Sequence, residues 1–160
     1  MKTLLLVRHA KSDWPEDTED FDRPLAESGI LDAQRMAEHL HGSGVKLDLL
    51  VSSPALRALS TCKIFNHYYQ TDMETNRKLY NANEGNFLSV IYELADDTKS
   101  VAMFSHNNGI SNFANTLCDT IFAFSTCGVA AWQIDCDAWA DFEGANKKLL
   151  FYVEPKNIQH

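Results

Sequence analysis

Three short apolar runs, spaced far apart along the chain, limit the choice of fold more than any other feature. They are TLLLV at 3–7, LDLLV at 47–51 and SVAMF at 100–104. A brief continuous apolar run bounded by polar residues is typical of a strand covered on both faces. Because such runs alternate with amphipathic stretches, we expect a three-layer α/β/α fold with a mostly parallel central sheet.

The stretches between these runs have the spacing of helices. In the first, apolar side chains recur on one helical face, namely Ile30, Ala33, Ala37 and Leu40, which predicts a helix over about 26–41. Ser53 is a candidate N-cap for a second helix, with Pro54 at its first position. Similar patterns predict helices over 54–69, 84–95 and 108–118, and an antiparallel edge pair at 129–135 and 148–155.

Composition restricts the class of protein. A chain of 160 residues that is 45% hydrophobic and 22% charged has the size of one compact domain spanning 1–160. Its formal net charge of −8 opposes non-specific attraction to nucleic acid or to an anionic membrane. The N-terminal MKTLLLV is too short for a signal peptide, and no apolar run reaches transmembrane length. We therefore expect a cytoplasmic protein whose partners are neither nucleic acids nor membranes.

The cysteines indicate neither a metal site nor a redox motif. The four lie at 62, 118, 127 and 136, without a CxxC pair or the spacing of a zinc site. We expect free thiols, buried, in a reducing compartment. A Cys127–Cys136 bridge across a hairpin is the alternative.

Charged and imidazole side chains follow three of the expected strands. Arg8 and His9 end the first, Arg57 lies shortly after the second, and His106 follows the third. The carboxyl ends of parallel strands meet at one edge of a sheet, where α/β proteins bind ligands. Any one of these residues alone is more often structural, but their joint placement predicts a shared pocket.

The residue types in this pocket suit a phosphoryl group. Two guanidinium groups offer permanent charge and planar donors to phosphate oxygens, and the nearby helix N-terminus adds backbone N–H groups. A neutral imidazole can attack phosphorus and form a covalent intermediate that water later resolves. One histidine would then attack while the other stabilises the transferring oxygens.

Four motifs carry a family resemblance: RHAKSDW (8–14), DRPLAESGILDA (22–33), SSPALRALST (52–61) and SHNNG (105–109). In this order they resemble the histidine phosphatase superfamily, which has the phosphoglycerate mutase-like fold, and the short chain is most similar to its SixA branch, named for a phosphohistidine phosphatase. The resemblance implies that His9 is the phosphorylated nucleophile and that Arg8, Arg57 and His106 hold the phosphoryl group. It also implies that neither a metal nor an organic cofactor is needed.

The sequence departs from the family pattern at the general acid. In RKLYNANEGN (77–86) the position that carries a glutamate or aspartate in many relatives is Asn81, whose amide is not an acid. Glu84 is the substitute candidate for the proton donor. An alkoxide leaving group gains about 10²- to 10⁴-fold in rate from a general acid, whereas an imidazole has a pKa of about 6.5 and leaves more readily once protonated. The missing acid therefore favours a phosphoramidate substrate.

Three functions remain open on this reading. The first is removal of phosphate from phosphohistidine on a signalling protein. The second is hydrolysis of a small phosphomonoester or a phosphopeptide, with Glu84 or water as the acid. The third is a phospho-ligand binding module that has lost catalysis, which the intact set of four pocket residues opposes.

The segment at 13–24 is rich in acids and is expected to form a solvated loop rather than a metal site. Within it, Asp22 and Arg23 belong to the family-like stretch. We expect these two residues to brace the loop of the pocket.

Overall fold

One sheet of six strands forms the centre of the protein, in a computed structural model that describes residues 1–158. The strands are β1 (Lys2–Arg8), β2 (Leu49–Ser52), β3 (Asp72–Thr75), β4 (Ser100–Ser105), β5 (Val129–Ile134) and β6 (Lys147–Val153). Their order in the sheet is β3-β2-β4-β1-β5-β6. The first four are mutually parallel, and the antiparallel strand β5 joins β1 to β6.

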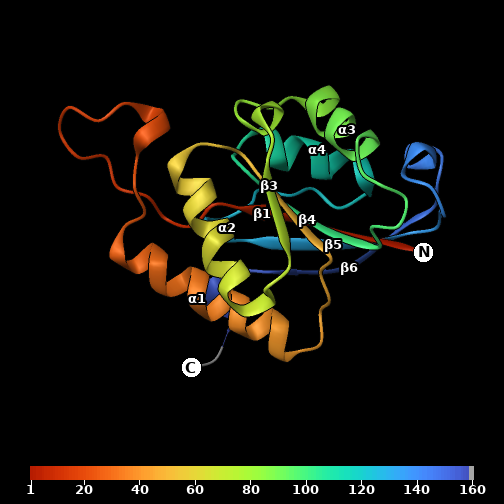
Figure 1. Ribbon diagram of the computed structural model, residues 1–160, viewed down its shortest axis with the longest axis horizontal. Coiled ribbons are helices and arrows are strands. Elements are labelled where there is room, and N and C mark those ends of the chain that lie inside the picture. Colours follow the sequence, from red (N-terminus) through yellow and green to blue (C-terminus); the bar gives the residue numbers. More distant parts are fainter. Residues whose placement is uncertain (159–160) are drawn as a thin grey trace.

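Four helices cover the two faces of this sheet (Figure 1). They are α1 (Glu27–Gly42), α2 (Leu56–Tyr69), α3 (Glu84–Tyr92) and α4 (Gly109–Leu117). Successive residues of β1 point to opposite faces, so Leu5 and Val7 pack on the α1–α2 side and Leu4 and Leu6 on the α3–α4 side. The expected three-layer α/β/α architecture with a mostly parallel sheet is confirmed.

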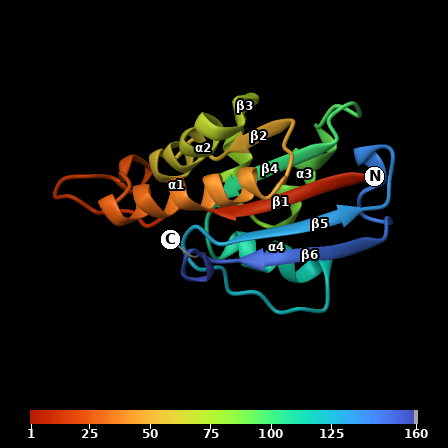
Figure 2. The same cartoon turned by 90° about the horizontal axis from the view of Figure 1, so that it is seen from below.

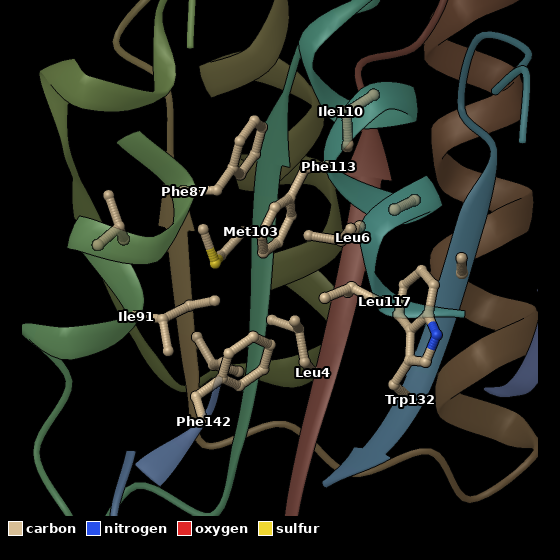
Figure 3. Packing of buried hydrophobic residues seen from close by; sticks show 14 of the residues in the cluster. Leu4, Leu6, Phe87, Ile91, Met103, Ile110, Phe113, Leu117, Trp132 and Phe142 are labelled. Atoms are coloured by element: carbon tan, nitrogen blue, oxygen red, sulfur yellow. The ribbon is translucent and has the colours of Figure 1, made fainter. Parts of the chain in front are cut away.

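The layer under α3 and α4 is packed by aromatic side chains (Figure 3). The rings of Phe87 in α3 and Phe113 in α4 stack with centroids 4.8 Å apart. Trp132 of β5 is fully buried in the same cluster. Burial of such side chains contributes about 1.5–3 kcal/mol each, which gives β1 and β4, and therefore the groups at their carboxyl ends, a rigid support.

The long connection from β1 to α1 extends beyond the body of the molecule (Figure 2). Its base is closed, because Ser12 forms a bridge with Leu25 and the Ala26 N–H donates to the Lys11 carbonyl at 2.9 Å. A single 3-10 turn at Asp20–Asp22 lies within it, and Asp20 contacts Arg57 of α2. The connection is therefore anchored at its two ends, next to the carboxyl end of β1.

The predicted elements are all present, with shifted ends. The expected helix at 54–69 begins only at Leu56, after Ala55 as N-cap, so the prediction that Ser53 caps it is wrong. The residue before a proline prefers extended backbone, and the chain turns into the helix two residues later. The hydroxyl of Ser53 instead contacts a side chain of the pocket described below. The expected helix at 84–95 ends at Tyr92.

All four cysteines are free, with Cys118 half-buried and the other three buried, so the alternative of a Cys127–Cys136 bridge is not realised.

Within the described part of the chain, no helix combines the length and the apolar character that crossing a membrane requires.

Two glycines of α1 make a matched test of the contact between this helix and the loop after β1. A Cβ at Gly29 would lie 2.1 Å from the Lys11 carbonyl oxygen, whereas one at Gly42 would meet nothing within 4 Å. We expect Gly29→Ala to lower the free energy of unfolding by about 1–3 kcal/mol and Gly42→Ala to leave it unchanged or raise it by up to about 1 kcal/mol. Urea unfolding of both variants measures this, and equal effects would contradict it.

Candidate active site

The carboxyl ends of β1, β2 and β4 meet at one pocket of about 450 Å³. Arg8 ends β1 and His9 follows it, Arg57 lies in the first turn of α2, and His106 follows β4. All four side chains line the pocket, as the sequence predicted. The lining residues are Arg8, His9, Lys11, Ser12, Asp20, Arg23, Arg57, Asn81, His106, Asn107 and Thr126.

The ring of His9 is held so that one nitrogen is left free. Its Nδ1 lies 2.7 Å from the carbonyl oxygen of Ala10, and because a carbonyl can only accept, Nδ1 carries the proton and donates it. The Nε2 atom of the neutral ring then keeps its lone pair. The backbone is fixed on both sides, since the His9 N–H donates to the Ser105 carbonyl at 3.1 Å and the His9 carbonyl accepts from Cys127 at 3.0 Å.

A hydroxyl joins the loop after β1 to the helix that carries Arg57. The Ala10 N–H donates to Thr61 Oγ1 at 3.0 Å, and the same hydroxyl donates to the Arg57 carbonyl at 2.8 Å. Ala10 is fully buried. This link fixes the position of His9 relative to Arg57.

Three buried nitrogen atoms of the pocket residues have no hydrogen-bond partner: Arg8 Nε, Arg57 Nε and His106 Nδ1. The other nitrogens of these side chains are engaged, for example Arg8 NH1, which donates to the Phe124 carbonyl at 2.6 Å. A buried polar group left unpaired costs about 1–3 kcal/mol, so these three nitrogens are a cost that the fold carries at this site. The guanidinium groups that line the pocket suit a tetrahedral oxyanion, whose oxygens accept hydrogen bonds from planar charged donors.

His106 lies against His9, with ring centroids 5.2 Å apart. Its Nε2 forms a hydrogen bond of 2.8 Å with the hydroxyl of Ser53, which also accepts from the Ala55 N–H at 3.3 Å. Ser53 therefore orients a pocket imidazole instead of capping α2.

Burial keeps both imidazoles neutral. It lowers the pKa of His9 to about 4, with the charges of Arg57 and Arg8 acting in the same direction and the hydrogen bond to Ala10 opposing them. Burial likewise lowers the pKa of His106 to about 3, assisted by His9 and Arg57. Both rings are thus uncharged at neutral pH, and an uncharged ring keeps the lone pair that a nucleophilic imidazole requires.

Asp20 is a pocket residue that the sequence did not predict. Its carbonyl accepts from Arg57 NH1 at 2.7 Å and its Oδ2 from Arg57 NH2 at 3.2 Å. Tyr80, from the segment between β3 and α3, donates to the same Oδ2 at 2.7 Å. Burial raises the pKa of Asp20, but the hydrogen bond from Tyr80 and the charge of Arg57 outweigh it, so the pKa is lowered. Nothing in the sequence pairs residues 20 and 80.

Asp22 and Arg23 were both expected to brace the loop of the pocket. Among the described residues, only Arg23 makes the contacts of such a role. This side chain lines the pocket and donates to Ser12 Oγ at 2.7 Å and to Asp20 Oδ1 at 3.3 Å. No hydrogen bond or ion pair of the Asp22 side chain is present in that part of the chain. The acidic loop is thus solvated except at Asp20, which turns inward.

The position expected for a general acid holds an amide. Asn81 lines the pocket in the left-handed region, with φ of 54°, a conformation that asparagine tolerates better than most residues. Glu84 is exposed at the first position of α3 and is absent from the pocket lining. Among residues 1–158, no group of three or more His, Cys, Asp or Glu side chains is placed to hold a metal ion.

A family model places this pocket among known proteins. Residues 4–115 match the model of the histidine phosphatase superfamily, branch 1. The chain belongs to this superfamily. An uncharacterized protein of Mycobacterium tuberculosis is 27% identical over 161 residues, which cover 94% of this chain and all of that one.

Two solved structures of the SixA type have the same fold as this member of the histidine phosphatase superfamily. One, from Nakamurella multipartitia and assigned as phosphohistidine phosphatase SixA, has a TM-score of 0.87 at 23% identity and covers 96% of each chain. The other is the protein histidine phosphatase SixA complexed with tungstate, with a TM-score of 0.83 at 23% identity, covering 97% of this chain and 98% of that one.

Histidine NMR in phosphate-free buffer measures the protonation of the two rings. We expect His9 and His106 to remain neutral at pH 5.5, where free histidine is mostly protonated. The unfolded chain takes up protons near pH 6.5 while the folded rings do not, so the free energy of unfolding should fall as the pH drops from 6.5 toward 4. Variants His9→Asn and His106→Asn assign the signals and should each reduce this pH dependence. A midpoint at or above 6.5 for either ring would contradict the burial effect.

Proposed function

We propose that the protein is a phosphatase that carries the phosphoryl group covalently on His9, and that its substrate is phosphohistidine on a phosphotransfer protein. The observation that carries this is the Nδ1–H donor of His9 to the Ala10 carbonyl. It leaves a neutral, unprotonated Nε2 in a pocket with three guanidinium groups. Membership of the histidine phosphatase superfamily and the fold of a protein histidine phosphatase support the same chemistry.

In the first half-reaction, the lone pair of His9 Nε2 attacks phosphorus and forms a P–N bond. The P–N bond of the substrate breaks, and its electron pair returns to the departing imidazole, which leaves as a neutral ring when its other nitrogen carries a proton. Arg8, Arg57 and His106, which line the pocket, hold the phosphoryl oxygens. The charge that develops on these oxygens is stabilised by groups already in place.

In the second half-reaction, a water oxygen attacks phosphorus from the side opposite His9. The P–Nε2 bond breaks, its electron pair returns to the ring, and inorganic phosphate leaves. Because guanidinium groups supply the stabilising charge, we propose that no metal ion or organic cofactor takes part. Free thiols at the described cysteines fit a reducing compartment, so the cytoplasm is the proposed location.

The choice of a phosphoramidate rests on the pocket lining. The amide of Asn81 occupies the position of the family's acid, and Glu84 lies outside the lining. A phosphomonoester would leave as an alkoxide without a carboxylic acid at that position to protonate it. A phosphohistidine needs no such group, because imidazole is the weaker base.

A substrate panel tests this choice. We expect kcat/KM for a protein carrying phosphohistidine to exceed that for a phosphoserine peptide or a sugar phosphate by at least about 10²-fold, the lower end of the contribution of a general acid. Initial rates of phosphate release on the three substrates measure it. Faster turnover of the sugar phosphate would favour the small-molecule alternative.

Rapid quench with ³²P-labelled substrate separates an enzyme from a binding module in the same experiment. His9→Asn should lose both the labelled intermediate and at least about 10³-fold of the rate, because no covalent route remains. His39→Asn, in an exposed part of α1, is the matched control and should behave as the unmodified protein. Binding of the phosphoprotein without ³²P label on His9 would show that the protein is a phospho-ligand binding module without catalysis.

Chelation tests the proposed independence of metals. Treatment with excess EDTA followed by gel filtration should leave kcat and KM unchanged within about twofold, because arginine and lysine side chains supply the positive charge of the pocket. Phosphate release with and without the treatment measures this. A loss of activity that returns on adding a divalent cation would contradict it.

A further inference from the structure

Asp20 raises a physical question, because it places a carboxylate among groups that bind a dianion. It is the one carboxylate in the pocket lining within the part of the chain that the structure describes. A carboxylate near a phosphoryl dianion is repelled by it and weakens substrate binding. A group with that cost, held in place by several contacts, calls for a role that outweighs it.

The contacts of Asp20 come from its own loop and from two distant parts of the chain. Arg57 of α2 donates to both its carbonyl and its carboxylate, Tyr80 donates to Oδ2, and Arg23 donates to Oδ1. The ring of Tyr80 lies edge-on to His106, with centroids 5.6 Å apart. These contacts fix the carboxylate beside the two groups that would hold the phosphoryl oxygens.

The carboxylate of Asp20 also has access to solvent. Its side chain is 40% exposed, whereas that of Arg57 is 8% exposed. A group that takes a proton from a reacting water must release it to solvent before the next cycle, so partial exposure is what such a group needs. Asn81 cannot accept this proton as a base, and Glu84 is outside the lining.

We propose that Asp20 is the general base of the second half-reaction, a role that rests on the proposed phosphorylation of His9. Asp20 accepts a proton from the water as its oxygen bonds to phosphorus. The P–Nε2 bond breaks, its electron pair returns to His9, and Asp20 passes the proton to solvent. Arg57 thereby has two roles, since it holds both the phosphoryl group and the base that activates water.

Pre-steady-state kinetics of Asp20→Asn with p-nitrophenyl phosphate test this step. Nitrophenolate is a good leaving group that needs no acid, so phosphorylation of His9 should proceed while hydrolysis slows by about 10²- to 10⁴-fold. We expect a burst of nearly one nitrophenolate per protein, followed by a slow steady state, and ³²P-labelled His9 accumulating in quenched samples.

The matched control is Asp22→Asn, which makes the same change of charge two residues away in the same loop. Asp22 is not part of the pocket lining, so this variant should show the kinetics of the unmodified protein. As a second test, formate added to Asp20→Ala should speed hydrolysis of the intermediate, because the site is open to solvent. A purely structural role would not give this rescue.

Four outcomes would overturn the assignment of the base. One is hydrolysis of the intermediate at the normal rate in Asp20→Asn, and another is tighter phosphate binding in that variant with an unchanged rate, as expected of a simple counter-ion to Arg57. The others are an equal loss in burst and steady state and the absence of formate rescue. Failure of the unmodified protein to label His9 with any donor would instead overturn the proposed function, so the two failures are distinguishable.

Discussion

Positive charge and imidazole groups gathered at the carboxyl ends of β1, β2 and β4 are the constraint on which the rest of the structure depends. Arg8 and Arg57 line one pocket with His9 and His106. Four groups of this kind are unfavourable together, because burial disfavours every cation among them. The protein tolerates them by keeping both imidazoles neutral and by rigid attachment to a buried sheet.

In the free protein, the carboxylate of Asp20 offsets part of the buried positive charge of the pocket. It supplies the counter-charge to Arg57, and its own ionised form is stabilised by Tyr80 and Arg57 in return. The acidic loop between β1 and α1 thus contributes to the pocket through one inward carboxylate, while most of its other charges face solvent. In the proposed reaction, that carboxylate would change from a counter-ion in the free pocket to a proton acceptor when water attacks.

Much of the fold could be predicted because its signals are local. The continuous apolar runs at 3–7 and 100–104 predict buried strands, and in the structure they form β1 and β4. The spacing of Ala33 and Ala37 likewise indicates the buried face of α1. The rule that parallel strands share a carboxyl edge then predicts that Arg8, His9, Arg57 and His106 lie together. The ends of the helices could be predicted less accurately. The residue before Pro54 prefers extended backbone, so α2 begins only at Leu56, and the pattern of apolar side chains does not indicate this.

The sequence by itself determined the three-layer fold, the family and four residues that line the shared pocket, because each follows from hydrophobic periodicity or from motifs within a few residues. Only the tertiary structure decided that the Ser53 hydroxyl serves His106, that Ala10 fixes the tautomer of His9, and that Asp20 meets Arg57 and Tyr80. Those contacts join residues up to 60 positions apart or depend on which ring nitrogen faces a carbonyl. Hydrogen bonds of 2.7–3.2 Å are set by the packing of whole elements, and no spacing along the chain encodes them.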